Sequence, residues 1–246
     1  MPFTFAHPAI ILPLNQSKLF SITALIAGSM VPDFEYFIQM REVENIGHRW
    51  YGILLFNFPI ALLFCFLFHN LLRNALIIHL PECLSHRLTD ILDFDWNAYA
   101  LKNKWKITIS VLVGIVSHLL LDAFTHHDGY FVEIFSILTV KTRIYELQIP
   151  VYFSLQLVLS VVGLIAIIHV MLQIPQKFTR FNKEKNKWYW PLFAFTLSLM
   201  LCIRLAGWPE YNSFWGVFMA LMGSLCYSWV FISVLFKNFS NKKIIA

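Results

Sequence analysis

The residues best suited to chemistry recur at four-residue intervals in the segment SHLLLDAFTHHDG, residues 117–129. His118, Asp122 and His126 would lie along one face of an α-helix, because four residues make slightly more than one helical turn. Two imidazoles and a carboxylate on one face are typical ligands of zinc or a similar divalent cation. The alternative is a hydrogen-bonded His–Asp pair that joins two helices without an ion.

A second acidic group lies in GSMVPDFEY, residues 28–36. Pro32 disfavours helix at Val31, so the apolar run before it should break and leave Asp33 at its end. Glu35 follows two positions later. Asp33 is either a metal ligand or the N-cap of the short helix that follows, and its local sequence taken alone favours the cap.

Three further residues stand out by their positions. His7 precedes a proline in MPFTFAHPA, and His48 lies in GHRWYG, directly before an apolar run. A single histidine near a membrane interface is more often a packing or surface residue, so both matter only if they gather with the acidic groups. Arg204 is a permanent charge inside an apolar run. It could clamp a phosphate or carboxylate, or form an ion pair with Glu210 or another acid on the outer face.

The composition indicates an integral membrane protein. Of 246 residues, 58% are hydrophobic and only 13% are charged, whereas soluble domains contain about 25% charged residues. This excludes a disordered chain, a secreted disulfide scaffold and a soluble nucleic-acid-binding module. The four cysteines are widely spaced and form no Cys-x-x-Cys pair, so we expect neither a disulfide nor a cysteine metal site.

Five apolar runs are long enough to cross a bilayer as helices. We therefore expect an all-α, multi-pass helical bundle that forms a single membrane domain over 1–246. Residues 1–130 would carry the metal site, and residues 131–246 would form mainly transmembrane scaffold. The run 19–31 is too short to cross, which favours a re-entrant or interfacial helix, with a signal peptide as the alternative. The predicted spans are 53–72, 107–124, 149–174, 188–206 and 214–236.

The basic residues predict an orientation. Most Lys and Arg lie between the first and second spans, between the third and fourth spans, and after the fifth. The positive-inside rule then places the C-terminus in the cytoplasm and residues 1–52 outside. The histidines and acids singled out above would all lie on the outer face.

The ordered set of MPFTFAHPA, GSMVPDFEY, His48 before an apolar run, and SHLLLDAFTHHDG resembles a bacterial family known as domain-of-unknown-function 4184. More distantly it resembles membrane-bound metal-dependent hydrolases of bacterial inner membranes, a group thought to be similar to zinc-dependent phospholipases C. The hydrolase group has a second histidine five residues after the first, where this chain has Ile53. One ligand is therefore missing or supplied by His126. The positions that match the group's ligands are His7, Asp33, His48, His118 and Asp122.

These observations favour a metal-dependent hydrolase of the plasma (inner) membrane that acts near the outer leaflet on a phosphoester or lipid-linked substrate. Zinc is the expected cofactor, with Glu35 or a spare carboxylate as general base and Arg204 holding the headgroup. The alternatives are a non-enzymatic membrane protein with a structural ion or polar network, and a transporter. Membrane lipid is the expected partner and nucleic acid is not; the sequence predicts no oligomeric state.

Overall fold

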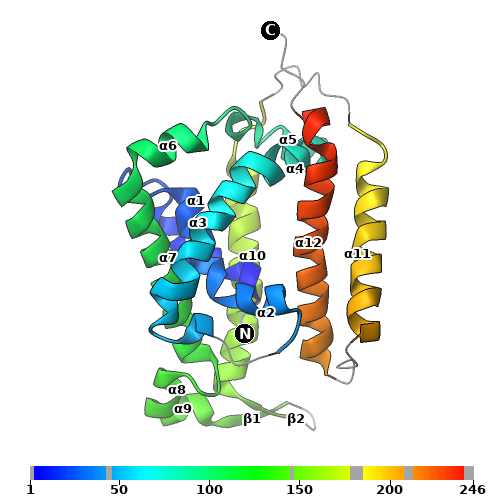
Figure 1. Cartoon of the computed structure of the whole chain (residues 1–246). Helices are drawn as coiled ribbons and strands as arrows, with labels where there is room; N and C mark the ends of the chain where they lie inside the picture. The colour runs from blue at the N-terminus through cyan, green and yellow to red at the C-terminus, as the bar shows by residue number, and fades with distance from the viewer. Residues whose placement is uncertain (1–2, 43–45, 145–146, 178–184, 208–212, 241–246) are drawn as a thin grey trace. The chain divides into compact units, whose positions relative to one another are not determined.

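A computed structural model describes residues 3–42, 46–144, 147–177, 185–207 and 213–240 (Figure 1). Within these ranges the regular secondary structure is helical apart from one antiparallel hairpin, which pairs β1 (Lys141–Ile144) with β2 (Leu147–Pro150). The predicted all-α class is therefore confirmed for the bulk of the fold, and the hairpin was not predicted. It occupies the start of the expected span 149–174, so that helix begins only at Val151.

Five helices in the described ranges are long and apolar enough to cross a membrane, as the hydropathy predicted. The first combines two α-helices with two π-helical turns, and the second joins α7 to the short α8. Their bounds are Ile53–His79, Lys104–Ile134, Val151–Gln173, Tyr189–Gly207 and Phe214–Lys237. The component elements are η4 (Ile53–Asn57), α3 (Phe58–Leu67), η5 (Phe68–Leu72), α4 (Arg73–His79), α7 (Lys104–Thr125), α8 (Tyr130–Ile134), α10 (Val151–Gln173), α11 (Tyr189–Gly207) and α12 (Phe214–Ser240).

The remaining elements are short. The apolar run 19–31 contains the nine-residue α1, which is about 14 Å long at 1.5 Å per residue and so is too short to cross a ~30 Å hydrocarbon core. The short elements are η1 (Thr4–Leu14), α1 (Ile22–Met30), η2 (Val31–Asp33), α2 (Phe34–Gln39), η3 (Ile46–His48), α5 (Glu82–Ser85), η6 (Thr89–Ile91), α6 (Trp96–Lys102) and α9 (Ser136–Thr139).

The chain divides into two compact units, each made of several segments. Unit 1 contains residues 1–33, 46–62 and 103–173. Unit 2 contains residues 34–45, 63–102 and 174–246. The prediction of a single membrane domain stays a prediction.

Unit 1 is organised by the crossing of α1 and α7. The two helices approach at Gly28 and Gly114, where a Cβ on Gly114 would lie 2.4 Å from the carbonyl oxygen of Leu25. Any side chain at that position would therefore collide with the α1 backbone. The crossing brings the end of α1 close to the second half of α7.

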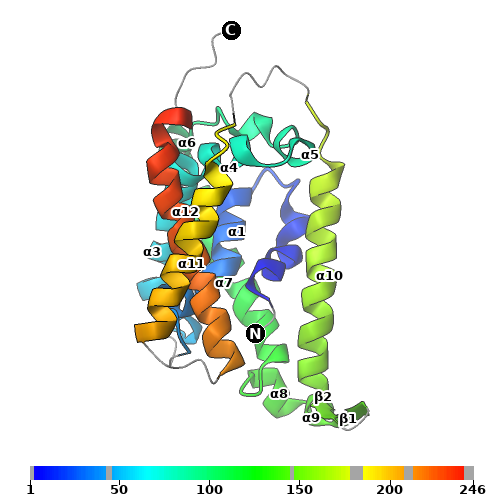
Figure 2. The ribbon, with the colours of Figure 1, turned by 90° about the vertical axis from the view of Figure 1, so that its right-hand side faces the viewer.

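Unit 2 contains α11 and α12, which run side by side in both ribbon views (Figures 1 and 2). Their contact is part of an apolar core in which the ring of Tyr189 lies 5.4 Å from that of Phe236. Helix α12 also packs against α2 and α4. The core residues are Ala75, Tyr189, Phe193, Ile232 and Phe236.

Candidate metal centre

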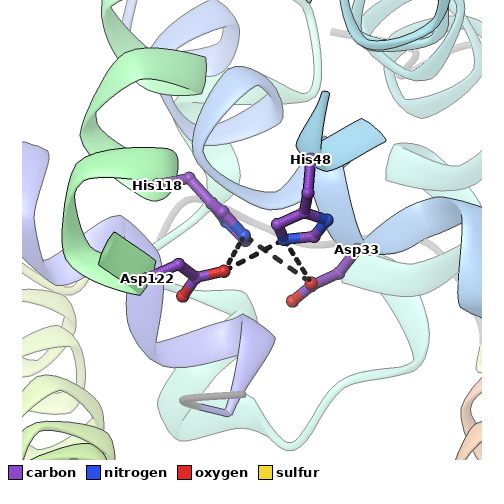
Figure 3. A group of neighbouring side chains, drawn as sticks. All are labelled: Asp33, His48, His118 and Asp122. Atoms are coloured by element: carbon purple, nitrogen blue, oxygen red, sulfur yellow. Dashed lines mark hydrogen bonds and ion pairs between the residues drawn. The ribbon is translucent and has the colours of Figure 1, made fainter. Parts of the chain in front are cut away.

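Four predicted ligands converge in unit 1 although they come from three separate segments of the chain (Figure 3). Asp33 ends η2, directly after α1, and His48 ends η3. His118 and Asp122 lie one turn apart on α7, as their spacing predicted. One ligand atom from each of the four lies within 4.8 Å of every other.

The distances suit a single ion at the centre of this group. The Nε2 atom of His118 lies 3.2 Å from Asp122 Oδ2 and 3.6 Å from Asp33 Oδ1. The Nε2 atom of His48 lies 3.0 Å and 3.7 Å from the same two oxygens. Ligands about 2.0–2.2 Å from a tetrahedral zinc ion are roughly 3.3–3.6 Å apart. The four His–Asp separations, 3.0–3.7 Å, bracket that value, and all the ligand atoms lie within 4.8 Å of one another.

Hydrogen bonds outside the group orient two of these side chains. The Nδ1 atom of His118 lies 2.8 Å from the carbonyl oxygen of Ser29. Because that oxygen can only accept, Nδ1 donates the hydrogen bond, and Nε2 is the ring nitrogen that faces the two carboxylates. Thr4 Oγ1 donates to Asp33 Oδ2 over 2.5 Å, which leaves Oδ1 facing the two histidines. Such outer partners commonly fix metal ligands.

These contacts also test the interpretation of Asp33 as an N-cap. Its Oδ2 is taken by Thr4, and its Oδ1 faces His48 and His118. Neither oxygen caps α2, so the N-cap interpretation is wrong. Nothing in the sequence singled out Thr4 or Ser29: a Thr–Asp hydrogen bond has no fixed spacing, and the Ser29 contact is made by a backbone atom.

The group is buried and polar. Asp33 and His118 are fully buried, whereas the side chain of His48 is 25% exposed. Asp33 Oδ1, His118 Nε2 and Asp122 Oδ1 have no hydrogen-bond partner within the described ranges. Buried polar atoms of this kind are costly unless something satisfies them. Burial tends to raise the pKa of Asp33, but His118 outweighs it and the pKa is lowered, as suits an anionic ligand.

The two remaining predicted ligands lie beside the group. The ring of His7 stacks on that of His118, with centroids 3.8 Å apart, and its Nε2 lies 3.7 Å from Asp122 Oδ1. Burial, followed by the neighbouring His118, lowers the pKa of His7 to about 3, so the ring is neutral. His126 Nδ1 lies 3.5 Å from Asp122 Oδ1.

His126 reaches this position by a route that its spacing did not predict. Helix α7 ends at Thr125, and the backbone of His126 is extended, with φ −107° and ψ 150°. The prediction of a continuous helical stripe through His126 is therefore wrong. Its side chain nevertheless meets Asp122 from the end of the helix.

The other two predicted site residues belong to unit 2. Glu35 is buried and accepts a hydrogen bond from Gln39 Nε2 over 3.2 Å. Arg204 Nε donates to the carbonyl oxygen of Met40 over 3.0 Å. The proposed ion-pair partner Glu210 lies outside the described residues. The roles predicted for Glu35 and Arg204 stay predictions.

Comparison with known protein families gives one match. A family model described as "Domain of unknown function (DUF4184)" matches residues 1–236, which is nearly the whole chain. No curated protein and no solved structure matches the chain.

Proposed function

The chain belongs to the family described as domain of unknown function (DUF4184), and we propose that it is a membrane-embedded, metal-dependent hydrolase. Its substrate would be a phosphoester or another lipid-linked bond near the outer leaflet of the plasma membrane. One observation carries this proposal: Asp33, His48, His118 and Asp122 converge within 4.8 Å from three segments of the chain.

The donor set fits a hydrolytic metal. Two imidazoles and two carboxylates suit zinc, which accepts mixed nitrogen and oxygen ligands. When bound, such an ion lowers the pKa of a water molecule to near neutrality and polarises the scissile group. His48 is the partly exposed member of the set, so substrate and water would approach on its side. Catalytic zinc sites need such an accessible position.

Each residue has a distinct part in this proposal. Asp33 and Asp122 would supply negative charge that offsets the cation. The Ser29 carbonyl oxygen accepts a hydrogen bond from His118 Nδ1, which leaves Nε2 as the nitrogen that would bind the ion. Glu35 is the proposed general base. Arg204 is the proposed contact for a substrate phosphate, because a guanidinium can donate two parallel hydrogen bonds to one phosphate group.

The membrane assignment rests on composition. Five helices of sufficient length and hydropathy support a multi-pass protein, with membrane lipid as its surroundings and as a substrate source. The excess of Lys and Arg in alternate connections supports a cytoplasmic C-terminus and a site near the outer face.

A hydrolysis assay tests the proposal. The purified protein would be reconstituted in vesicles, stripped of metal with a chelator, reloaded with zinc, and given bis-p-nitrophenyl phosphate and phosphatidylcholine as substrates. We expect turnover that requires zinc and that falls at least about 10–100-fold in His118→Ala, which is the loss typical when a residue that supports a metal ligand is replaced. The matched control is His127→Gln, because the His127 side chain is 79% exposed and pairs with Asp128. A His118→Ala protein as active as the control would contradict the proposal.

A second candidate is a structural ion in a protein without enzymatic activity. It is favoured by the complete burial of Asp33 and His118 and by apolar Ile53 where the resembling hydrolases have a further histidine. It predicts that zinc raises the melting temperature while neither phosphoester is cleaved.

A further inference from the structure

Arg73 of unit 2 is a buried permanent charge without an ion-pair partner. It begins α4, and only 6% of the residue is exposed. Within the described ranges, the one ion pair made by a lysine or arginine joins Lys177 to Asp90. Asp93 is exposed and lies beyond ion-pair distance, so it acts on Arg73 only at longer range. Because arginine is almost never buried unless it is paired, a counterion is expected here.

Neutral groups hold the guanidinium of Arg73 in place. Its Nη1 donates to the carbonyl oxygen of Phe94 over 2.7 Å and to His69 Nδ1 over 3.2 Å, and its Nε donates to Asn74 Oδ1 over 2.8 Å. Since an arginine nitrogen can only donate, Nδ1 accepts and the His69 ring carries no charge. These bonds fix the side chain without neutralising it, and they leave Nη2 with no acceptor in the described part of the chain.

Trp96 supplies a second donor beside this arginine. Its ring stacks on that of His69, with centroids 4.6 Å apart and planes at 3°. The residue is 2% exposed, and its Nε1 has no hydrogen-bond partner among the described residues, although a buried indole N–H usually finds an acceptor. Arg73 bonds to the edge of the His69 ring and Trp96 stacks on its face, so two donors that lack an acceptor share one neighbour.

Two elements of unit 2 build this group. His69 lies in the π-helical turn η5, four positions before Arg73, and Trp96 is the first residue of α6. Asn70 and Asn97 tie the two elements together through reciprocal amide hydrogen bonds of 3.2 and 3.0 Å. Both amides are exposed, so the group borders the surface. π-Helical turns are rare and frequently occur at functional sites.

The depth of Arg73 in the first membrane-length helix suits a phosphate. It lies 20 residues after Ile53, where that helix begins, which corresponds to about 30 Å of helix and to about the thickness of a hydrocarbon core. Arg73 would therefore lie at the level of the lipid headgroups, on the cytoplasmic side in the predicted orientation. Lipid phosphates lie at that level, and a guanidinium binds phosphate through short, charge-assisted hydrogen bonds.

We propose that Arg73 and Trp96 bind the phosphate group of an anion at this end of unit 2. Arg73 supplies the charge and the hydrogens of Nη2, and Trp96 supplies the neutral Nε1–H. His69 positions both side chains. The phosphate belongs either to a phospholipid of the surrounding leaflet or to a free phosphate ion. This site is separate from the metal cluster of unit 1, and it does not depend on the proposed hydrolase activity.

Binding of two phosphate sources tests the proposal. The full-length protein would be delipidated and stripped of metal in dodecyl maltoside. It would then be titrated with dioleoylphosphatidylglycerol, followed by native mass spectrometry, and with radiolabelled inorganic phosphate, followed by equilibrium dialysis. Dioleoylglycerol, which has the same acyl chains and no phosphate, measures the background of lipid binding. We expect saturable binding of one phosphate-containing probe per chain above that background.

Two variants with matched controls identify the donors. Arg73→Gln removes the buried charge and should weaken binding at least about 10-fold, whereas Lys102→Gln removes an exposed charge and should not. Trp96→Phe removes the N–H and keeps a ring that can stack on His69. It should weaken binding roughly 10-fold, which is about what one hydrogen bond to a charged group contributes. Its control is Trp105→Phe, because Trp105 is 81% exposed.

The outcomes separate the two sources and decide the proposal. Binding of phosphatidylglycerol alone assigns the site to a lipid, and binding of inorganic phosphate alone assigns it to a free anion; both support it. If thermal unfolding shows that Arg73→Gln does not fold, the comparison of Trp96→Phe with Trp105→Phe decides. The site would be overturned if neither probe binds, or if the folded Arg73→Gln and Trp96→Phe proteins bind as tightly as their controls.

Discussion

Replacing Gly114 by alanine should weaken metal binding without touching a ligand. A Cβ at this position would lie 2.4 Å from the Leu25 carbonyl oxygen and 2.7 Å from the Ser29 backbone nitrogen. Both are backbone atoms of α1 and cannot rotate away. Helix α1 must therefore move from α7 by roughly 1 Å to restore an ordinary contact distance.

That displacement acts directly on the metal site. Asp33 follows α1 in the chain, and the Ser29 carbonyl oxygen holds His118 Nδ1 at 2.8 Å. Metal–ligand distances tolerate only about ±0.2 Å. We expect zinc affinity to fall about 10–100-fold, as when an outer partner of a ligand is lost, and stability to fall by about 1–3 kcal/mol, as for other overpacked interiors.

The assay is competition for zinc against a chelator of known affinity, together with thermal unfolding of the metal-free protein. The matched control is Gly207→Ala, because a Cβ on Gly207 meets nothing within 4 Å. A Gly114→Ala protein whose zinc affinity equals that of the control would refute the idea that the α1–α7 crossing sets the ligand geometry.

Three further results are expected. His118→Ala and Asp122→Asn should both lose bound zinc and still insert in membranes, since hydrophobic spans drive insertion; zinc retained at full stoichiometry in both would sink the ligand assignment. Zinc should be released on acidification from pH 7 to pH 4 and rebound on return, because an imidazole ligates only when neutral and protons compete below about pH 6.5; binding that strengthens toward low pH would argue against histidine ligands. In intact cells an epitope inserted after Gly207 should be accessible from outside and a C-terminal epitope should not, as the distribution of Lys and Arg predicts; external labelling of the C-terminus would reverse the orientation.

The membrane-length helices were the most predictable part of the fold. A run of about 20 apolar residues can be recognised in the sequence alone, because its length and hydropathy suit a membrane-crossing helix whatever that helix packs against. The hairpin was missed because its strands, KTRI and LQIP, are only four residues each. Strands this short show no clear alternation of apolar and polar residues, and the second was partly included in the predicted span. Element η1 was missed because Pro8 and Pro13 interrupt any helical period.

The candidate site was predictable only where its residues share an element or a motif. His118 and Asp122 followed from their four-residue spacing on α7. The place of His126 did not, because the helix ends one residue before it. That Thr4 and Ser29 position Asp33 and His118 is a consequence of tertiary packing, and a single sequence contains no signal for it.

The central claim is that these side chains hold a divalent cation, and X-ray absorption at the zinc edge tests it most directly. The account predicts that the zinc-loaded protein shows nitrogen and oxygen neighbours at about 2.0–2.2 Å and outer-shell scattering from imidazole rings that diminishes in His118→Ala. A spectrum of hydrated zinc without imidazole scattering, unchanged by His118→Ala, would contradict it.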